Sequence, residues 1–291
     1  MTAPREFDAY WREIDDELAN VEARPTLELM RRHSGDRFTV WALRMTSIGP
    51  IRIFAYLSVP AGAGPFPAVL EAPRYGSVNL VPDYNDRLRY VVLTVMHRGQ
   101  RLADDTFAAA YPGLFTLGIE RPATYIYRRI VADCLRGAEV LLARPEVDLS
   151  RVAAVGGDLA LITAARRPEI CTLRTTPGLF YRAIEARLLN SSESLDELND
   201  VLRAWPEREV AVGRTLALFD PLNHAPAVRA RTLLVEGDDG SWCAPLAAAL
   251  GGEAERFRPT HQGGTDNDSL DAWLAARLRV PAMSRFLRSV G

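Results

Sequence analysis

An α/β fold, with a mostly parallel central sheet and helices on both of its faces, is the fold class that this sequence predicts. Two observations support it. Short apolar runs alternate with segments of helical periodicity, as parallel strands joined by helices do. A chain of 291 residues with 48% apolar and 25% charged residues can also bury a large core. A single domain over residues 1–291 therefore accounts for the whole sequence.

The N-terminal part predicts a helix followed by a β-hairpin. Residues 5–20 place aromatic and aliphatic side chains at helical spacing, which indicates an amphipathic helix on the outside of the domain. We assign it to an N-terminal helical extension over residues 1–35. Residues 37–46 and 50–58 alternate apolar and polar side chains around a Gly-Pro turn, which favours an antiparallel pair of strands.

The remaining segments supply the core of the expected sheet. Strands are predicted at 67–71, 90–96, 151–156, 171–176, 231–237 and 254–259, and helices at 124–143, 159–166 and 269–278. The segment from about 180 to 225 is helical and polar, so we expect it to be an insertion beside the functional face. No internal repeat or domain linker interrupts this order.

Composition and charge exclude several classes of function. The net charge of −2 gives no field that favours nucleic acid or an anionic membrane. All 35 basic residues are arginines, which rules out a lysine nucleophile or a Schiff base. The cysteines, Cys134, Cys171 and Cys243, are odd in number and far apart, and they indicate free thiols in a reducing compartment. Because neither a signal-peptide pattern nor a membrane-spanning run is present, we predict a cytoplasmic protein.

The sequence contains no pattern typical of a metal or nucleotide site. Histidine pairs at helical spacing, paired cysteines, G-x-G-x-x-G and the P-loop pattern are all absent from it. We therefore expect no metal and no cofactor, and we expect a small-molecule substrate.

The most informative segment is a predicted strand–turn–helix at residues 151–165. A β-branched run leads into two glycines, then a polar residue, then a helix-forming run. This is the context of the nucleophile elbow of α/β-hydrolases, normally G-x-S-x-G. Here the pattern is Gly156-Gly157-Asp158-Leu159-Ala160, so a carboxylate, Asp158, stands where the serine would be. We predict an α/β-hydrolase fold with an exchanged nucleophile.

Motifs along most of the chain resemble those of one family. Phe7-Asp-Ala-Tyr-Trp11 is similar to its D-F-x-x-F-W helix, Arg98-Gly99-Gln100 matches R-G-Q, and residues 214–220 match R-T-L-x-x-F-D. Residues 111–148 follow the family pattern closely between R-G-Q and the elbow. On these motifs the chain resembles the acetyl xylan esterase and cephalosporin C deacetylase family, carbohydrate esterase family seven, as a divergent member.

The resemblance implies a set of catalytic positions that are unevenly retained. The family elbow G-G-S-Q-G-G has Asp158 in place of serine. His261, in His261-Gln-Gly-Gly264, matches the histidine of H-E-G-G. The column of the family acid holds Gly240, and Asp239, one residue earlier, is the candidate substitute. The implied catalytic residues are therefore Asp158, His261 and Asp239.

The resemblance also implies an oxyanion and substrate-binding set. Tyr75, before Gly76, matches the tyrosine whose backbone N–H is one oxyanion donor, and Leu159 replaces the glutamine that supplies the other. Arg98 completes the set, although a structural role, in which it ties loops by bidentate hydrogen bonds, is also expected of it. The family assembles as ring-like hexamers, which implies a homo-oligomer here.

Asp158 and His261 each have a structural interpretation as well. Asp is a preferred N-cap and is stabilised as an anion at a helix N-terminus. The carboxylates of haloalkane dehalogenases and epoxide hydrolases, in contrast, act as nucleophiles at a similar position. The polar segment around His261 could equally form an N-cap and Asx-turn cluster for the helix 269–278. If His261 is a base, Asp239 or Asp266 would orient its ring.

Three functional hypotheses follow, of which we predict the first and keep the third as the alternative. In the first, a hydrolase uses Asp158 as nucleophile and His261 as base on a small ester, lactone, epoxide or halide. In the second, Asp158 is only a general base in ester hydrolysis. In the third, the chain is a non-catalytic relative that binds a small molecule or a partner.

Overall fold

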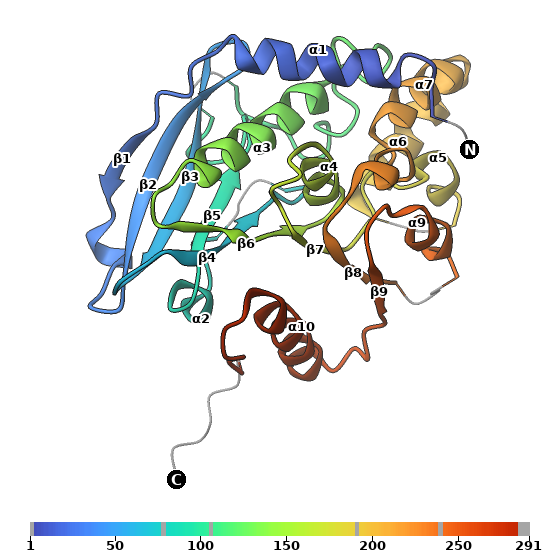
Figure 1. Cartoon of the computed structure of the whole chain (residues 1–291). Helices are drawn as coiled ribbons and strands as arrows, with labels where there is room; N and C mark the ends of the chain where they lie inside the picture. Colours follow the sequence, from blue (N-terminus) through green and yellow to red (C-terminus); the bar gives the residue numbers. More distant parts are fainter. Residues whose placement is uncertain (1–2, 77–79, 105–106, 190–191, 238–240, 285–291) are drawn as a thin grey trace.

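The computed structural model of the chain describes residues 3–76, 80–104, 107–189, 192–237 and 241–284. Within them one nine-stranded sheet has the order β1-β2-β3-β5-β4-β6-β7-β8-β9 (Figure 1). The pairs from β1 to β3 and the β3–β5 pair are antiparallel, and the five pairs from β5–β4 to β8–β9 are parallel. The strands are β1 (Thr26–Leu29), β2 (Phe38–Ser47), β3 (Ile51–Pro60), β4 (Phe66–Glu71), β5 (Val91–Met96), β6 (Val147–Gly156), β7 (Thr172–Thr175), β8 (Arg231–Val235) and β9 (Ala254–Phe257).

Helices cover both faces of this sheet, as the sequence predicts (Figure 1). They are α1 (Phe7–Ala19), α2 (Tyr84–Arg87), α3 (Ile126–Leu142), α4 (Asp158–Arg166), α5 (Ala183–Ala186), α6 (Glu193–Ala204), α7 (Glu209–Phe219), α8 (Pro221–His224), α9 (Ala244–Ala249) and α10 (Gly263–Leu278), with short 3₁₀ turns η1 (Arg31–His33), η2 (Pro206–Arg208) and η3 (Ala225–Ala227). In Figure 1, α1, α3 and α4 lie on one side of the sheet and α10 lies on the other.

The alternation of side chains along the central strands explains why both faces need a cover. On β4 and β5, Leu70 and Leu93 join the large core beneath α3 and α4, whereas Val69 and Val92 join a smaller core. That second core is completed by Leu274 and other apolar residues of α10. Successive residues of a strand face opposite sides, so these apolar runs need helices on both faces.

The predicted hairpin and N-terminal helix are present, with one addition. β2 and β3 pair antiparallel from Phe38↔Pro60 to Ser47↔Ile51. β1 lies inside the segment that we predicted as a helical extension and adds an edge strand to β2. Its four residues are all exposed, and so they lack the alternation of apolar and polar side chains that reveals a half-buried strand.

Two element boundaries also differ from the prediction. β6 begins at Val147 instead of residue 151, and α10 begins at Gly263 instead of residue 269. The first turn of α10 contains the two glycines of a segment that reads as a loop in sequence. The insertion predicted at about 180–225 consists of the short helices α5 to α8.

No helix in the described part of the chain is long and apolar enough to cross a membrane.

Two helical glycines differ in the space around them, because Gly137 is crowded and Gly213 is not. They therefore test how tightly the helices pack. A Cβ on Gly137 of α3 would lie 2.5 Å from Val95 Cγ2 of β5, whereas a Cβ on Gly213 of α7 would meet only Ile184 Cγ1 at 3.9 Å. We expect Gly137→Ala to lower the free energy of unfolding by about 1–3 kcal/mol through overpacking. Gly213→Ala should raise it by about 0.5–1 kcal/mol through helix propensity. Urea unfolding of the two variants checks this; equal effects of the same sign would contradict it.

Candidate functional site at the β6–α4 turn

The turn between β6 and α4 has the order of a nucleophile elbow without its strained residue. β6 ends at Gly156, whose φ is +149°, and Asp158 is already the first residue of α4. A Cβ on Gly156 would lie 3.2 Å from Ala72 Cβ, so glycine is needed there for both conformation and space. Asp158 is not among the residues with positive φ. A hydrolase elbow, in contrast, presents its nucleophile on a sharp, strained turn.

The carboxylate of Asp158 is buried and receives hydrogen bonds from four consecutive backbone N–H groups. Oδ1 accepts from Gly178 at 3.1 Å, and Oδ2 accepts from Leu179, Phe180 and Tyr181 at 2.8, 2.5 and 3.1 Å. The residue is 1% exposed. Burial raises the pKa of Asp158 above its usual range, and the four amide bonds oppose that shift.

A second buried carboxylate continues this arrangement by one residue. Asp220 Oδ2 accepts from the backbone N–H of Arg182 at 3.1 Å, and its Oδ1 caps α8 by accepting from Leu222 at 2.9 Å. Together Asp158 and Asp220 therefore bind the amides of five consecutive residues, 178–182. Arg182 itself has a left-handed φ of +48°. We name residues 178–182 the anchored segment.

The anchored segment is packed against the region where the elbow of a hydrolase would open to substrate. Phe180 is fully buried among aromatic rings, including Phe115, Tyr127 and Phe219. The hydroxyl of Tyr181 donates to the carbonyl of Trp242 at 2.7 Å. These contacts hold the segment over the Asp158 carboxylate, so water and substrate have no direct route to it.

His261 lies in an exposed turn between β9 and α10, with a φ of +60°. Beside it, Asp266 accepts from the backbone N–H of Thr260 at 2.9 and 3.0 Å and from its hydroxyl at 2.8 Å. The amide bond from Thr260 is the main cause that lowers the pKa of Asp266, and an amide bond from His261 adds to it. Asp266 thus organises the turn before α10 from a position inside that helix, and the N-cap residue, Gln262, makes no side-chain cap bond. Asp239 lies outside the described residues.

The predicted oxyanion loop is fixed by groups from distant parts of the chain. The hydroxyl of Tyr75 donates to Glu197 Oε2 of α6 at 2.5 Å, and burial together with this carboxylate raises the pKa of Tyr75. Glu197 also accepts from the backbone N–H groups of Phe115, at 3.3 Å, and Thr116, at 2.7 Å. The carbonyl of Gly76, whose φ is +137°, accepts from Gln100 Nε2 at 2.8 Å.

Arg98 has the structural role expected of it, and the structure does not support the substrate contact. Its guanidinium bonds Asp133 of α3 through Nε and Nη2, at 3.0 and 2.7 Å, and its Nη2 also donates to the carbonyl of Ile48. Arg98 is 1% exposed, so it cannot reach a substrate. Leu159 is 3% exposed and packs in the large core.

A neighbouring histidine, His97, is also buried. Its Nδ1 lies 2.6 Å from the carbonyl of Arg98, and burial lowers the pKa of His97 to about 4. The ring therefore stays neutral at physiological pH.

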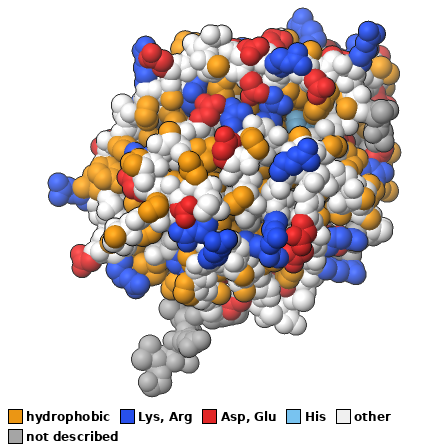
Figure 2. Space-filling model, in the orientation of Figure 1, with side chains coloured by type: hydrophobic (Ala, Val, Ile, Leu, Met, Phe, Trp, Pro, Cys, Tyr) orange, Lys and Arg blue, Asp and Glu red, His pale blue; other side chains and the backbone are white. Residues whose placement is uncertain are grey.

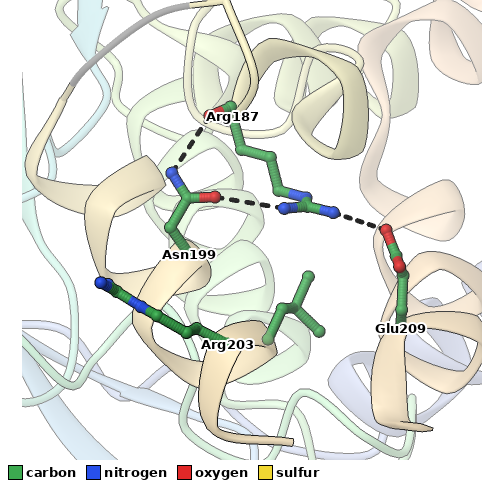
Figure 3. A pocket seen from close by; sticks show the side chains of 5 residues that line it. Arg187, Asn199, Arg203 and Glu209 are labelled. Carbon is green, nitrogen blue, oxygen red and sulfur yellow. Dashed lines mark hydrogen bonds and ion pairs between the residues drawn. The ribbon is translucent and has the colours of Figure 1, made fainter. Parts of the chain in front are cut away.

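A cavity of about 400 Å³ lies within the insertion and away from the elbow residues (Figure 3). Arg187 crosses it, pairing with Glu209 of α7 at 2.5 Å and donating to Asn199 Oδ1 of α6 at 3.3 Å. Asn199 returns a bond to the carbonyl of Arg187 at 3.1 Å. Arg187, Asn199 and Glu209 thus pair with one another across the cavity, while Arg187 Nε has no hydrogen-bond partner among the described residues.

The sequence did not predict the hydrogen-bond partners of Tyr75 and Asp158. The partner of Tyr75, Glu197, belongs to no motif, and the polar sequence of its helix is typical of any exposed helix. The anchored segment begins 20 residues after Asp158, and its contribution is backbone amides, which leave no trace in residue type. No local pattern could have joined them.

The sheet order, the two-sided helical cover and the turn between β6 and α4 define an α/β-hydrolase fold. The sequence profile of the acetyl xylan esterase family (AXE1) matches residues 1–249, and the chain belongs to that family. It is 22% identical to acetyl esterase Axe7A of Xylanibacter ruminicola over 264 residues. This alignment covers 85% of this chain and 59% of that protein. The chain thus spans well under two thirds of this relative.

Solved structures agree with the fold. The acetyl xylan esterase from Paenibacillus sp. R4 superposes with a TM-score of 0.81 at 24% identity, covering 95% of this chain and 96% of the other. Acetyl xylan esterase 1 from Thermoanaerobacterium sp. JW/SL YS485 gives 0.76 at 22% identity, covering 95% of each chain. At these identities the likeness concerns the fold.

Removing the Asp158 carboxylate should destabilise the protein strongly. Asp158→Ala leaves four N–H groups without their acceptor, two of them on the buried residues Phe180 and Tyr181, so we expect the free energy of unfolding to fall by about 3 kcal/mol. His261→Ala, at an exposed turn, should change it by no more than about 0.5 kcal/mol. Chemical unfolding of both variants measures this, and a small effect of Asp158→Ala would show that the amides find other acceptors.

Asp220 should give stability a specific pH dependence. Burial raises the pKa of Asp220 to about 6. Between about pH 4 and 6 the native state keeps a proton that the unfolded chain releases, so this group's contribution to stability falls as the pH rises through that window. The free energy of unfolding of the wild type minus that of Asp220→Asn should fall by up to about 3 kcal/mol as the pH rises from about 4 to 6. A pH-independent difference would argue against this titration.

Proposed function

We propose that this chain is a non-hydrolytic member of the acetyl xylan esterase family that acts by binding a small molecule or a partner chain. The observation that carries the proposal is the set of four backbone N–H groups that occupy the buried carboxylate of Asp158. In this interpretation Asp158 holds the anchored segment in place and is not a nucleophile.

The chemistry of a carboxylate nucleophile supports this proposal. Attack on carbon needs an oxygen lone pair within reach of the substrate, and hydrogen bonds to that oxygen weaken it as a nucleophile. Oδ2 of Asp158 already accepts three bonds and Oδ1 one, at 1% exposure. To react, Asp158 would have to give up most of these bonds and displace Phe180 and Tyr181 from the core.

The alternative is the hydrolase with Asp158 as nucleophile or general base and His261 as the base on water. Two observations favour it: the family profile matches most of the chain, and His261 lies in an accessible turn after the last strand, where the family histidine is expected. It requires the anchored segment to withdraw when substrate binds. The substrate would be a small ester, lactone, epoxide or halide.

One experiment separates the two proposals. Wild type, Asp158→Asn and His261→Ala are incubated with an aryl acetate, an epoxide and an alkyl halide, with single turnover in heavy-oxygen water. We expect no turnover above the buffer rate in any of the three proteins and no label in Asp158, while Asp158→Asn unfolds at lower urea than His261→Ala.

The opposite outcome is equally clear. Turnover by wild type that is lost in both variants, with label in the Asp158 carboxylate, would establish the nucleophile mechanism. Turnover lost in both without label would establish general-base chemistry. Asp148→Asn is the matched control, because Asp148 is a carboxylate of β6 that, among the described residues, accepts hydrogen bonds only from Ser150 and Arg151.

A further inference from the structure

A second hollow, of about 220 Å³, lies at the carboxyl end of β5. β5 and β6 are two positions apart in the sheet, so these two strands lie about 10 Å from each other. Ligands of open α/β sheets bind outside the carboxyl ends of the strands. The hollow is therefore placed where this fold can receive a ligand, although no residue of the catalytic set lines it.

The wall of the hollow is mainly apolar. Met96, the last residue of β5, is 1% exposed and forms part of it together with Leu80, Val81 and Leu102. Leu80 is 79% exposed, which is unusual for a leucine beside a cavity that it could cover. An apolar surface left open to water favours a ligand with a hydrophobic body.

Three polar groups border the same hollow. Arg101 and His33 are exposed, and Tyr56 of β3 is partly exposed. In the described part of the chain none of these three side chains has an ion pair or a side-chain hydrogen bond. Arg31 and Arg32 precede His33 in η1, Asp36 follows His33 by three residues, and Asp104 follows Arg101 by three. Arg101 gives the border of the hollow a positive charge beside the phenol donor of Tyr56, a combination that suits a carboxylate.

The backbone on this side is held in place before any ligand binds. Leu102 has a φ of +73°, which costs a non-glycine residue free energy. Its carbonyl accepts from Arg44 Nη1 at 3.1 Å, and the adjoining turn is closed by bonds from Ala103 N to Gln100 O and from Gly99 N to Ala103 O. A strained residue that is fixed in this way presents its side chain to the hollow at little further entropic cost.

We propose that this hollow is a binding site for a compact hydrophobic monocarboxylate. The carboxylate pairs with Arg101 and accepts from the Tyr56 hydroxyl, His33 adds a second donor, and the apolar body lies on Met96, Leu80 and Leu102. The volume is below the roughly 300–1,000 Å³ typical of sites for drug-sized ligands, so the body is no larger than one ring or a short branched chain. The site goes beyond the proposed function and does not depend on whether the elbow is catalytic.

Benzoate is the probe, and its binding to the full chain is measured by heteronuclear NMR titration. We expect saturable shifts at Leu80, Met96 and Leu102. Benzyl alcohol, which has the same ring without the charge, should bind at least tenfold more weakly. Arg101→Gln should weaken benzoate at least fivefold, and Leu80→Glu should abolish its binding. Arg129→Gln, an exposed arginine of α3, is the matched control and should bind as wild type does.

Several results would overturn the proposal. Equal benzoate affinity of Arg101→Gln and wild type would show that Arg101 does not bind the carboxylate. Shifts confined to residues outside the hollow would show that benzoate binds elsewhere. Equal binding of benzyl alcohol would show an apolar site without charge selection. Benzoate binding is measured directly by NMR. Its absence would therefore not change what the Asp158 and His261 variants show about the elbow.

Discussion

A buried carboxylate without a cation partner is the constraint on which the functional face of this protein depends. Moving an anion out of water is costly unless hydrogen bonds replace its hydration. Asp158 meets this requirement with four backbone amides from a segment that begins 20 residues downstream. The same bonds that make the charge tolerable fix the path of the chain between β7 and α5, and they determine which surface the elbow presents.

Glu197 is a further buried carboxylate, besides Asp158 and Asp220, that binds backbone amides. It accepts from the backbone of residues 115 and 116 and from the hydroxyl of Tyr75, so it joins the loop after β4 to the segment before α3. In a hydrolase, loops of this kind must leave room for substrate and for a tetrahedral intermediate. Here the loops are held by carboxylates of the protein itself.

The fold was largely predictable from the sequence, and the site was not. The apolar runs of β4, β5 and β8 and the long amphipathic α3 are signals carried by neighbouring residues, and these elements lie close to where they were expected. The exposed strand β1 escaped because no burial pattern marks it. At the site, Asp158 was identified as the decisive residue, but its partners are amides without a sequence signature. The choice between nucleophile and anchor therefore depends on tertiary contacts that a linear pattern cannot encode.

Glu197 also sets a limit on how this architecture can be divided. The insertion that contains α6 resembles a separate addition to the domain. In protein engineering, such a segment would be a candidate for removal or for exchange with the insertion of a relative. Its carboxylate, however, supplies acceptors to Phe115, which is buried in the core, and to Thr116 and Tyr75, which are partly buried. Excision of α6 would remove the acceptor of all these donors. The insertion and the domain are thus one folding unit, and chimeras made at its borders should carry a replacement acceptor with them.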